Sequence, residues 1–319
     1  MLTRTLPSPG ALAALSGGID SGIADLDRAN VLRPGALTLV DAAGAATDVL
    51  YAWMADAAVL GRRVLVADGG NFLDVYRLAA AARRRAAARL PDAPRRELAA
   101  FEELTLDRVR LARGFTAYQV QSIVEDILPR EARAEAEAGA EADAEAGAGA
   151  EADAEVGEDV GLIVAPGLLE MYLDDELSRD EALTLAKRAL STLRRLAARL
   201  HAPAVVSNST LSPRSDHPMR VLLEESVDEH VLLAGAPRTG LAIHLPRRGA
   251  AFLAPAPGRT RLEDFLDPDE RATPIAPHAP RAPGAWRSNG NRMYGKFGEA
   301  RRRDPWVALE ARNAAEEAA

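Results

Sequence analysis

The residues best placed for chemistry lie in one short stretch, Gly35 to Asp48, which reads GALTLVDAAGAATD. Its apolar part, residues 36–40, predicts a buried strand, and a helical pattern begins at Asp48. The turn between them consists of small residues, among which Gly44 takes a positive φ at low cost. Backbone N–H groups at a tight turn before a helix bind phosphate. The stretch therefore has the layout of a phosphate site.

The side chains around this turn decide what such a site can do. A phosphate loop of the P-loop type has the pattern Gly-x-x-x-x-Gly-Lys-Ser/Thr, in which the lysine reaches the phosphates and the hydroxyl binds Mg²⁺. On that pattern, Asp41 and Ala46 replace the two glycines. Thr47 replaces the lysine, and Asp48 replaces the hydroxyl. We therefore expect a vestigial phosphate loop at Gly44, Thr47 and Asp48, with no catalytic residue, no cofactor and no metal ion.

Other polar residues have two interpretations each. Asp68 follows the predicted strand 63–67, where it is a general base or metal ligand, or else a cap of the next turn. The acidic residues 174–176 form a metal site or a solvated helix start. The five histidines have no metal-ligand spacing, and we assign them no role.

The hydrophobic pattern predicts the elements that position these residues. Apolar runs indicate strands at residues 36–40, 63–67, 109–112, 160–165 and 203–207. Helical patterns lie between them, at residues 72–85, 93–103 and 180–200. We expect a loop at 211–220 and an added hairpin-like edge from the late segments 229–233, 240–245 and 250–253. The alternation predicts an α/β fold with a mostly parallel sheet and antiparallel edge strands.

Composition excludes several classes of protein. The 319 residues are 48% hydrophobic, which is enough for a sizeable core. The sequence has no apolar run of about 18 residues and no apolar core of a signal peptide near its start. It contains no cysteine, so disulfides, thiol catalysis and cysteine-ligated metals are excluded. We expect a cytoplasmic location.

The net charge of −8 comes from one segment. Residues 131–159 carry eleven acids and one arginine, so the rest of the chain sums to about +2. This alanine-rich, self-repelling segment is typical of a solvated loop inserted into a core. A second interpretation is an acidic surface that competes with DNA phosphates.

The two ends of the chain differ in composition from its middle. We expect a flexible leader at 1–14, a core at 15–267 that includes the acidic insertion, and a proline-rich linker with a basic, aromatic tail at 268–319. Cations and aromatic rings together are typical of segments that bind single-stranded DNA. The candidates for this contact are Arg292, Tyr294, Lys296, Phe297, Arg301, Arg302 and Arg303. The alternative is a tail that docks on its own core or on an acidic partner.

Three motifs in order carry a family resemblance. They are SGIADLD at 21–27 followed by Arg33-Pro34-Gly35, DGGNF at 68–72 with YRLA at 76–79, and LARGFTAYQ at 111–119. Together they resemble the ATPase cores of RecA/RadA-type recombinases, and most closely those of archaeal RadA paralogs. The resemblance covers residues 15–255. It implies a RecA-like P-loop NTPase core with degenerate Walker A and Walker B motifs and an extended C-terminal tail.

The departures from that family are consistent with one another. The family's phosphate-loop lysine and its magnesium-binding hydroxyl are replaced at Thr47 and Asp48. The fourth strand, which ends in a magnesium-ordering aspartate in the family, ends here in Val-Ala-Pro-Gly at 164–167. The catalytic glutamate after the second strand corresponds to Asp68-Gly69, and the nucleotide-sensing glutamine corresponds to Ser209. The resemblance therefore implies a paralog that no longer hydrolyses ATP.

Three functions follow as hypotheses. The first is an accessory or regulatory factor in DNA recombination and repair, which binds single-stranded DNA, an active recombinase or other copies of itself. The second is an ATPase whose remodelled site is completed by a neighbouring subunit, with ATP and Mg²⁺ as cofactors and the metal held by Asp48 and Asp68. The third is a structural interaction protein without nucleic-acid contact.

Overall fold

A computed structural model describes residues 17–42, 47–133, 160–174, 176–213, 215–236 and 240–255 of the chain. The chain divides into two units, 1–259 and 260–319, and every described residue belongs to the first. The predicted leader, linker and tail lie outside the described residues, as do most of the acidic insertion and Gly44.

The fold is built on one eight-stranded sheet of the order β3-β2-β4-β5-β1-β6-β7-β8. All pairings from β3 to β6 are parallel, and β7 is antiparallel to both of its neighbours. The expected α/β fold with a mostly parallel sheet is confirmed. The strands are β1 (Leu37–Ala42), β2 (Arg63–Asp68), β3 (Val109–Arg113), β4 (Val160–Ala165), β5 (Ala204–Asn208), β6 (Glu229–Ala236), β7 (Gly240–Leu245) and β8 (Ala250–Pro255).

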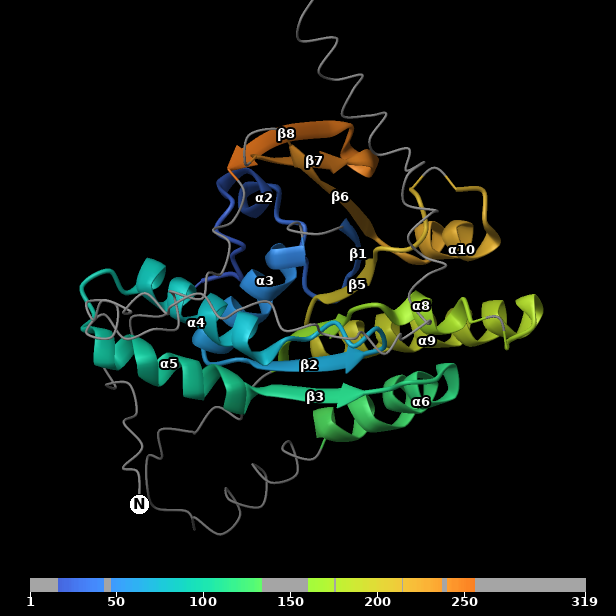
Figure 1. Ribbon diagram of the computed structural model, residues 1–319, viewed down its shortest axis with the longest axis horizontal. Helices are drawn as coiled ribbons and strands as arrows, with labels where there is room; N and C mark the ends of the chain where they lie inside the picture. Colours follow the sequence, from blue (N-terminus) through green and yellow to red (C-terminus); the bar gives the residue numbers. More distant parts are fainter. Residues whose placement is uncertain are drawn as a thin grey trace, which may run out of the picture. The chain divides into compact units, whose positions relative to one another are not determined.

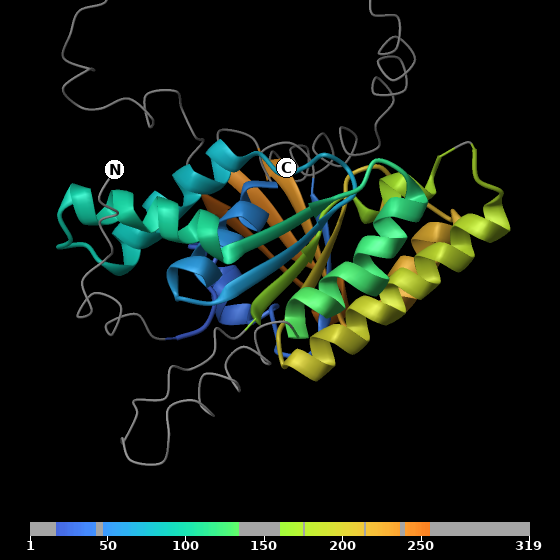
Figure 2. The same ribbon diagram turned by 90° about the horizontal axis from the view of Figure 1, so that it is seen from below.

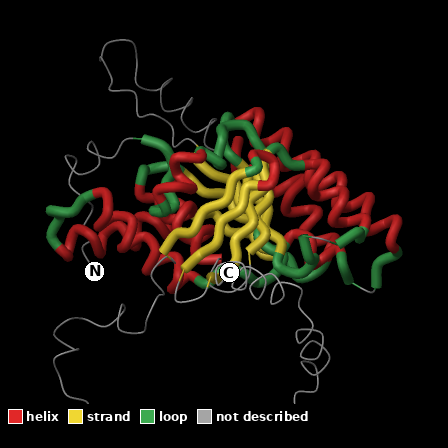
Figure 3. Tube along the Cα trace, turned by 90° about the horizontal axis from the view of Figure 1, so that it is seen from above, coloured by secondary structure: helices red, strands yellow, loops and turns green. Residues whose placement is uncertain are grey.

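Helices cover both faces of the sheet, as Figures 1 and 3 show. One face carries α3 (Asp48–Val59) and α4 (Val75–Arg89), and α5 (Arg95–Arg108) packs on these two. The other face carries α6 (Ala117–Ser122), its π-helical continuation η2 (Ile123–Ile127), α8 (Leu168–Tyr172), α9 (Arg179–Leu200) and α10 (Pro218–Ser226). The short helices α2 (Ala24–Ala29) and η4 (Pro246–Arg248) complete the described elements. Figure 2 shows the sheet between these two layers.

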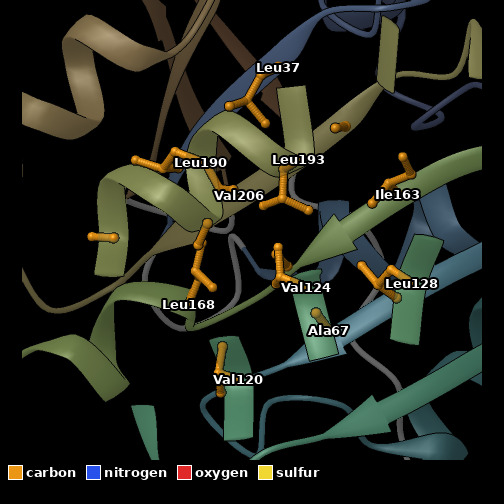
Figure 4. Packing of buried hydrophobic residues seen from close by; sticks show 14 of the residues in the cluster. Leu37, Ala67, Val120, Val124, Leu128, Ile163, Leu168, Leu190, Leu193 and Val206 are labelled. Atoms are coloured by element: carbon orange, nitrogen blue, oxygen red, sulfur yellow. The ribbon is translucent and has the colours of Figure 1, made fainter. Parts of the chain in front are cut away.

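Each face of the sheet has its own hydrophobic core, because successive side chains of a strand point to opposite faces. In β1, Val40 packs on the side of α3, whereas Leu37 and Leu39 pack on the side of α9. Figure 4 shows Leu37 with Val206, Leu193 and other members of this second cluster. Burial on both faces explains why β1, β2 and β4 read as continuous apolar runs.

Helix α9 forms where its apolar stripe predicts it. The buried residues Leu185, Ala189, Leu193 and Leu196 recur at helical spacing. The Ser178 side chain accepts a hydrogen bond from the N–H of Glu181, which caps the start of the helix. No helix in the described part of the chain is long and apolar enough to cross a membrane.

Several boundaries predicted from the sequence are wrong. Strand β1 continues through Asp41 and Ala42, which were assigned to the turn. Helix α10 starts inside the predicted loop 211–220, because Pro218 fits its first turn and Met219 and Leu223 bury one face. The acidic insertion starts later than residue 131, since residues 131–133 are helical and Ala132 is buried.

The late segments form the predicted hairpin-like edge, with antiparallel pairings β6–β7 and β7–β8, but one pairing was not predicted. Strand β6 pairs in parallel with β1, inside the sheet. Strand β8 is antiparallel to β7 and therefore runs in the same direction as β6, so β7 alone among the described strands is reversed. The pattern of the segment 229–233 does not reveal its pairing with β1, because the two strands are distant in sequence.

Candidate functional site at the carboxyl edge of the sheet

The candidate site lies where the parallel strands end. The carboxyl end of β1 leads to Thr47 and Asp48 at the start of α3. The ends of β2, β4 and β5 bring Asp68, Pro166 and Asn208 to the same edge. Ligands of open α/β sheets bind at this edge, where neighbouring strands send their helices to opposite faces. Strands β2 and β4 meet that condition, because α4 and α8 lie on opposite faces.

An arginine occupies the position beside the start of α3. Arg77, on the first turn of α4, forms an ion pair with Asp48 and donates a hydrogen bond to the hydroxyl of Thr47 at 3.4 Å. The Asp48 side chain is 8% exposed and the Arg77 side chain is 35% exposed. Asp48 thus places its negative charge at the positive end of the α3 dipole and binds a cation as well. The anion at this helix start comes from the protein itself.

Aromatic packing holds Arg77 in place. Its guanidinium lies over the ring of Tyr51, 4.6 Å from the centroid. The Tyr51 ring stacks on Phe72 at 5.5 Å. The Tyr51 hydroxyl donates to the carbonyl of Phe72 at 2.8 Å and accepts from the N–H of Asp74 at 2.9 Å. A cation fixed by a ring and a carboxylate is pre-oriented, so it loses little side-chain freedom in forming the pair.

Sequence reasoning missed Arg77 as a site residue. No lysine is near the turn in sequence, and the cation comes instead from a helix that begins 27 residues after Asp48. The available signal was the YRLA motif at 76–79, which places an arginine on the first turn of the helix that follows β2. That motif was used only as a mark of resemblance.

Asp68 caps a turn. Its two carboxylate oxygens accept from the N–H groups of Phe72 at 2.7 Å and Leu73 at 3.1 Å. One of them also accepts from Nε of Arg113 at 2.9 Å, and the side chain is fully buried. Arg113 in turn donates to the carbonyl of Leu73 at 2.9 Å. These contacts correspond to the capping interpretation of Asp68.

Asp41 is the centre of a buried polar network. Its carboxylate accepts from Arg220 at 2.7 Å, from Nδ2 of Asn208 at 2.6 Å and from Nε2 of His230 at 2.6 Å. Arg220 also pairs with Glu224 at 2.7 Å. Burial opposes ionisation of Asp41, but the hydrogen bonds from His230 and Arg220 outweigh it, so the pKa of Asp41 lies below its ordinary value.

The position of Asp41 corrects its role in the predicted loop. On the phosphate-loop pattern it stood in the turn, at the place of the first glycine. It is instead 3% exposed, belongs to β1, and is neutralised by a guanidinium that is 1% exposed.

The loops after β2 and β4 touch through glycines. Gly167 has a φ of +64°, and a Cβ atom there would lie 2.8 Å from Cα of Gly70. The N–H of Gly69 donates to the carbonyl of Pro166 at 3.2 Å. Glu170, on α8, accepts from the Ser209 hydroxyl at 2.5 Å and so joins the helix after β4 to the loop after β5. Backbone contacts therefore close the edge between β2 and β4.

Three aspartates of this edge are each bound by an arginine of the same chain. The pairs are Asp41–Arg220, Asp48–Arg77 and Asp68–Arg113. Across the described ranges, no group of three or more His, Cys, Asp or Glu side chains has the arrangement of a metal site. In the other acidic candidate, Asp174 accepts from the N–H of Glu176 at 3.0 Å, a local turn contact. Asp175 and the seven DNA-binding candidates of the tail lie outside the described residues.

The fold and this edge define an α/β protein with a mostly parallel eight-stranded sheet. No protein-family model matches the chain, and no curated protein matches it either.

Proposed function

We propose that this protein is a RecA-like paralog with a P-loop NTPase-type core that does not hydrolyse ATP. On this proposal it acts as an accessory or regulatory factor in DNA recombination and repair. The ordered motifs at 21–35, 68–79 and 111–119 support the relationship. The place of Thr47 and Asp48, after the first strand and at the start of a helix, is that of a phosphate loop.

The observation that carries the loss of ATP turnover is the Asp48–Arg77 pair. A triphosphate at the start of α3 meets a carboxylate at the helix N-terminus and a cation that is already bound. It must compete with Asp48 for Arg77 while its own charge repels Asp48. The helix dipole favours the anion by only about 0.3–1 kcal/mol. The Asp48 carboxylate at the N-terminus of α3 already receives this stabilisation from the helix dipole. The sum of these interactions therefore disfavours nucleotide binding.

Contacts with DNA or with an active recombinase remain part of the same proposal. Their support is the composition of the tail, where basic and aromatic side chains alternate between residues 281 and 306. Such a segment binds phosphates through cations and bases through ring faces.

The test of the proposal has two arms. Calorimetric titration with ATP·Mg²⁺ at millimolar concentration, together with a phosphate-release assay with and without DNA, is expected to give no signal above background. Binding tighter than about 100 µM, abolished by Asp48→Ala, would support the remodelled ATPase instead. In the second arm, fluorescence anisotropy with a labelled single strand is expected to show salt-sensitive binding. Its absence would favour a structural interaction protein.

A further inference from the structure

A surface groove of about 500 Å³ lies between α9 and α10. These two helices pack side by side on one face of the sheet, at the right of Figure 1. The α9 wall consists of Leu183, Thr184 and Lys187, and the other wall consists of Asp216, Pro218, Val221, Leu222 and Glu225. The lining thus combines apolar side chains with the charged groups of Lys187, Asp216 and Glu225.

Three charged residues line this groove. Lys187, Asp216 and Glu225 have no ion-pair partner among the residues that the structure describes. Some other charges of α9 and α10 are paired within the chain, as Arg188–Glu125 at 2.6 Å, Arg194–Asp228 at 2.6 Å and Arg220–Glu224 at 2.7 Å. Val221, which lines the same groove, is an apolar side chain that is 45% exposed. Unpaired charges and exposed apolar surface therefore coincide here.

The two walls are complementary to each other in charge. Helices α9 and α10 run in the same direction, because α9 joins β4 to the parallel β5, and α10 joins β5 to β6, which lies parallel to β1. The cation Lys187 is on the α9 wall, and the anion Glu225 is on the α10 wall. A two-fold axis along the groove lays α9 of one copy over α10 of the other. This operation sets each Lys187 opposite a Glu225, twice per interface.

We propose that this groove is the interface of a symmetric dimer of the chain. In it, α10 of each copy packs on α9 of the other, Val221 contacts Leu183, and Lys187 pairs with Glu225 across the two-fold axis. Apolar contacts fill the centre and charge pairs lie at the rim, which is the usual anatomy of a protein interface. The proposal is independent of nucleotide and DNA binding.

Charge reversal in the full-length chain tests the dimer. Sedimentation velocity over about 1–100 µM is expected to show a monomer–dimer equilibrium for the wild type. Lys187→Glu and Glu225→Lys each place like charges opposite one another at two points. Each is therefore expected to raise the dimer dissociation constant by about tenfold or more. The double variant, Lys187→Glu with Glu225→Lys, restores both pairs with reversed signs and is expected to return the dissociation constant to near the wild-type value.

A matched control separates the interface from a general effect of charge. Arg195→Glu reverses an exposed cation two turns further along α9 that does not line the groove, and it is expected to leave the equilibrium unchanged. Circular dichroism and the thermal midpoint establish that each variant is folded. The proposal is overturned by a wild type that stays monomeric, by single reversals without effect, or by a double variant as weak as the singles. An equal effect of Arg195→Glu would do the same.

Discussion

The buried Asp41–Arg220 pair gives the sharpest prediction about stability. Arg220→Met keeps most of the volume of the side chain and removes its charge. It leaves Asp41, 3% exposed, without its guanidinium partner. Removing one partner of a buried ion pair costs about 3–5 kcal/mol, because the remaining charge is uncompensated. Asp41 keeps its hydrogen bonds to His230 and Asn208, so we expect the lower end, about 3 kcal/mol.

The assay is chemical and thermal unfolding of the full-length chain. A domain of about 150–250 residues loses about 2–4 °C of thermal midpoint per kcal/mol, so Arg220→Met is expected to lower the midpoint by about 6–12 °C. Asp41→Asn alone removes the charge that Arg220 binds. The double variant is expected to cost at least about 1 kcal/mol less than the sum of the two single variants, since neither side then carries an unpaired charge.

A surface pair serves as the matched control. Arg194 pairs with Asp228 at 2.6 Å, but its side chain is 53% exposed. Arg194→Met is expected to cost about 0–1 kcal/mol, the range of exposed pairs. A loss for Arg220→Met no larger than that of the control would refute the argument from burial. Strict additivity in the Asp41–Arg220 cycle would show that the two side chains do not act on each other.

The same network predicts a pH dependence with a definite sign. The pKa of Asp41 is lower in the folded protein than its ordinary value of 3.8. Its contribution to stability is therefore present above about pH 4 and is lost as the pH falls through the folded pKa. Urea unfolding below pH 4 is expected to show that the free energy of unfolding falls more steeply with decreasing pH in the wild type than in Asp41→Asn. An equal dependence of the unfolding free energy on pH in both proteins would show that Asp41 does not cause it.

The remaining predictions concern the phosphate-site pair, the insertion and the tail. Arg77→Ala is expected to destabilise by about 1–3 kcal/mol, measured by urea unfolding, because Asp48 loses its cation and keeps only the helix N-terminus; no loss would mean that solvent already screens the pair. Replacing residues 134–159 with a short Gly/Ser linker is expected to move the thermal midpoint by a few degrees at most, whereas loss of soluble expression would place the segment in the folded body. Joint replacement of Arg301, Arg302 and Arg303 by Ala is expected to remove about three phosphate contacts and to flatten the slope of log affinity for a labelled single strand against log salt; an unchanged slope would exclude the DNA-binding arm.

The sequence was most informative where local pattern and tertiary burial agree. The strands of the central sheet are continuous apolar runs because both faces are covered, and that pattern is visible without a structure. Helix α9 is long enough for its apolar stripe to repeat five times or more, so its bounds were predicted to within one residue. Helix α10 has nine residues, between a loop and a strand, and offers too few repeats for the period to be recognised.

The sequence was least informative about which charges meet. Asp41 looked like a turn residue because an aspartate rarely ends a buried strand without partners. Its partners Asn208, Arg220 and His230 lie 167, 179 and 189 residues further along the chain. No local rule connects such positions, since only the topology β5–β1–β6 brings them together. The same holds for Arg77 and Asp48, which meet because β1 and β2 each lead into a helix on the same face.

The three acid–arginine pairs of the carboxyl edge differ in how readily they open. Arginine stays charged at any pH at which the protein is folded, so none of the pairs is released by deprotonation of its cation. Protonation of the carboxylate at low pH, a competing anion or a change of side-chain position can separate them. The arginine side chains are 35% exposed at Arg77, 30% at Arg113 and 1% at Arg220. Arg113 is also held by the carbonyl of Leu73, whereas Arg77 is held chiefly by one carboxylate and a ring face. Arg77 is thus the most exposed and least constrained of the three arginines, which makes the Asp48–Arg77 pair the one that a competing anion opens most readily.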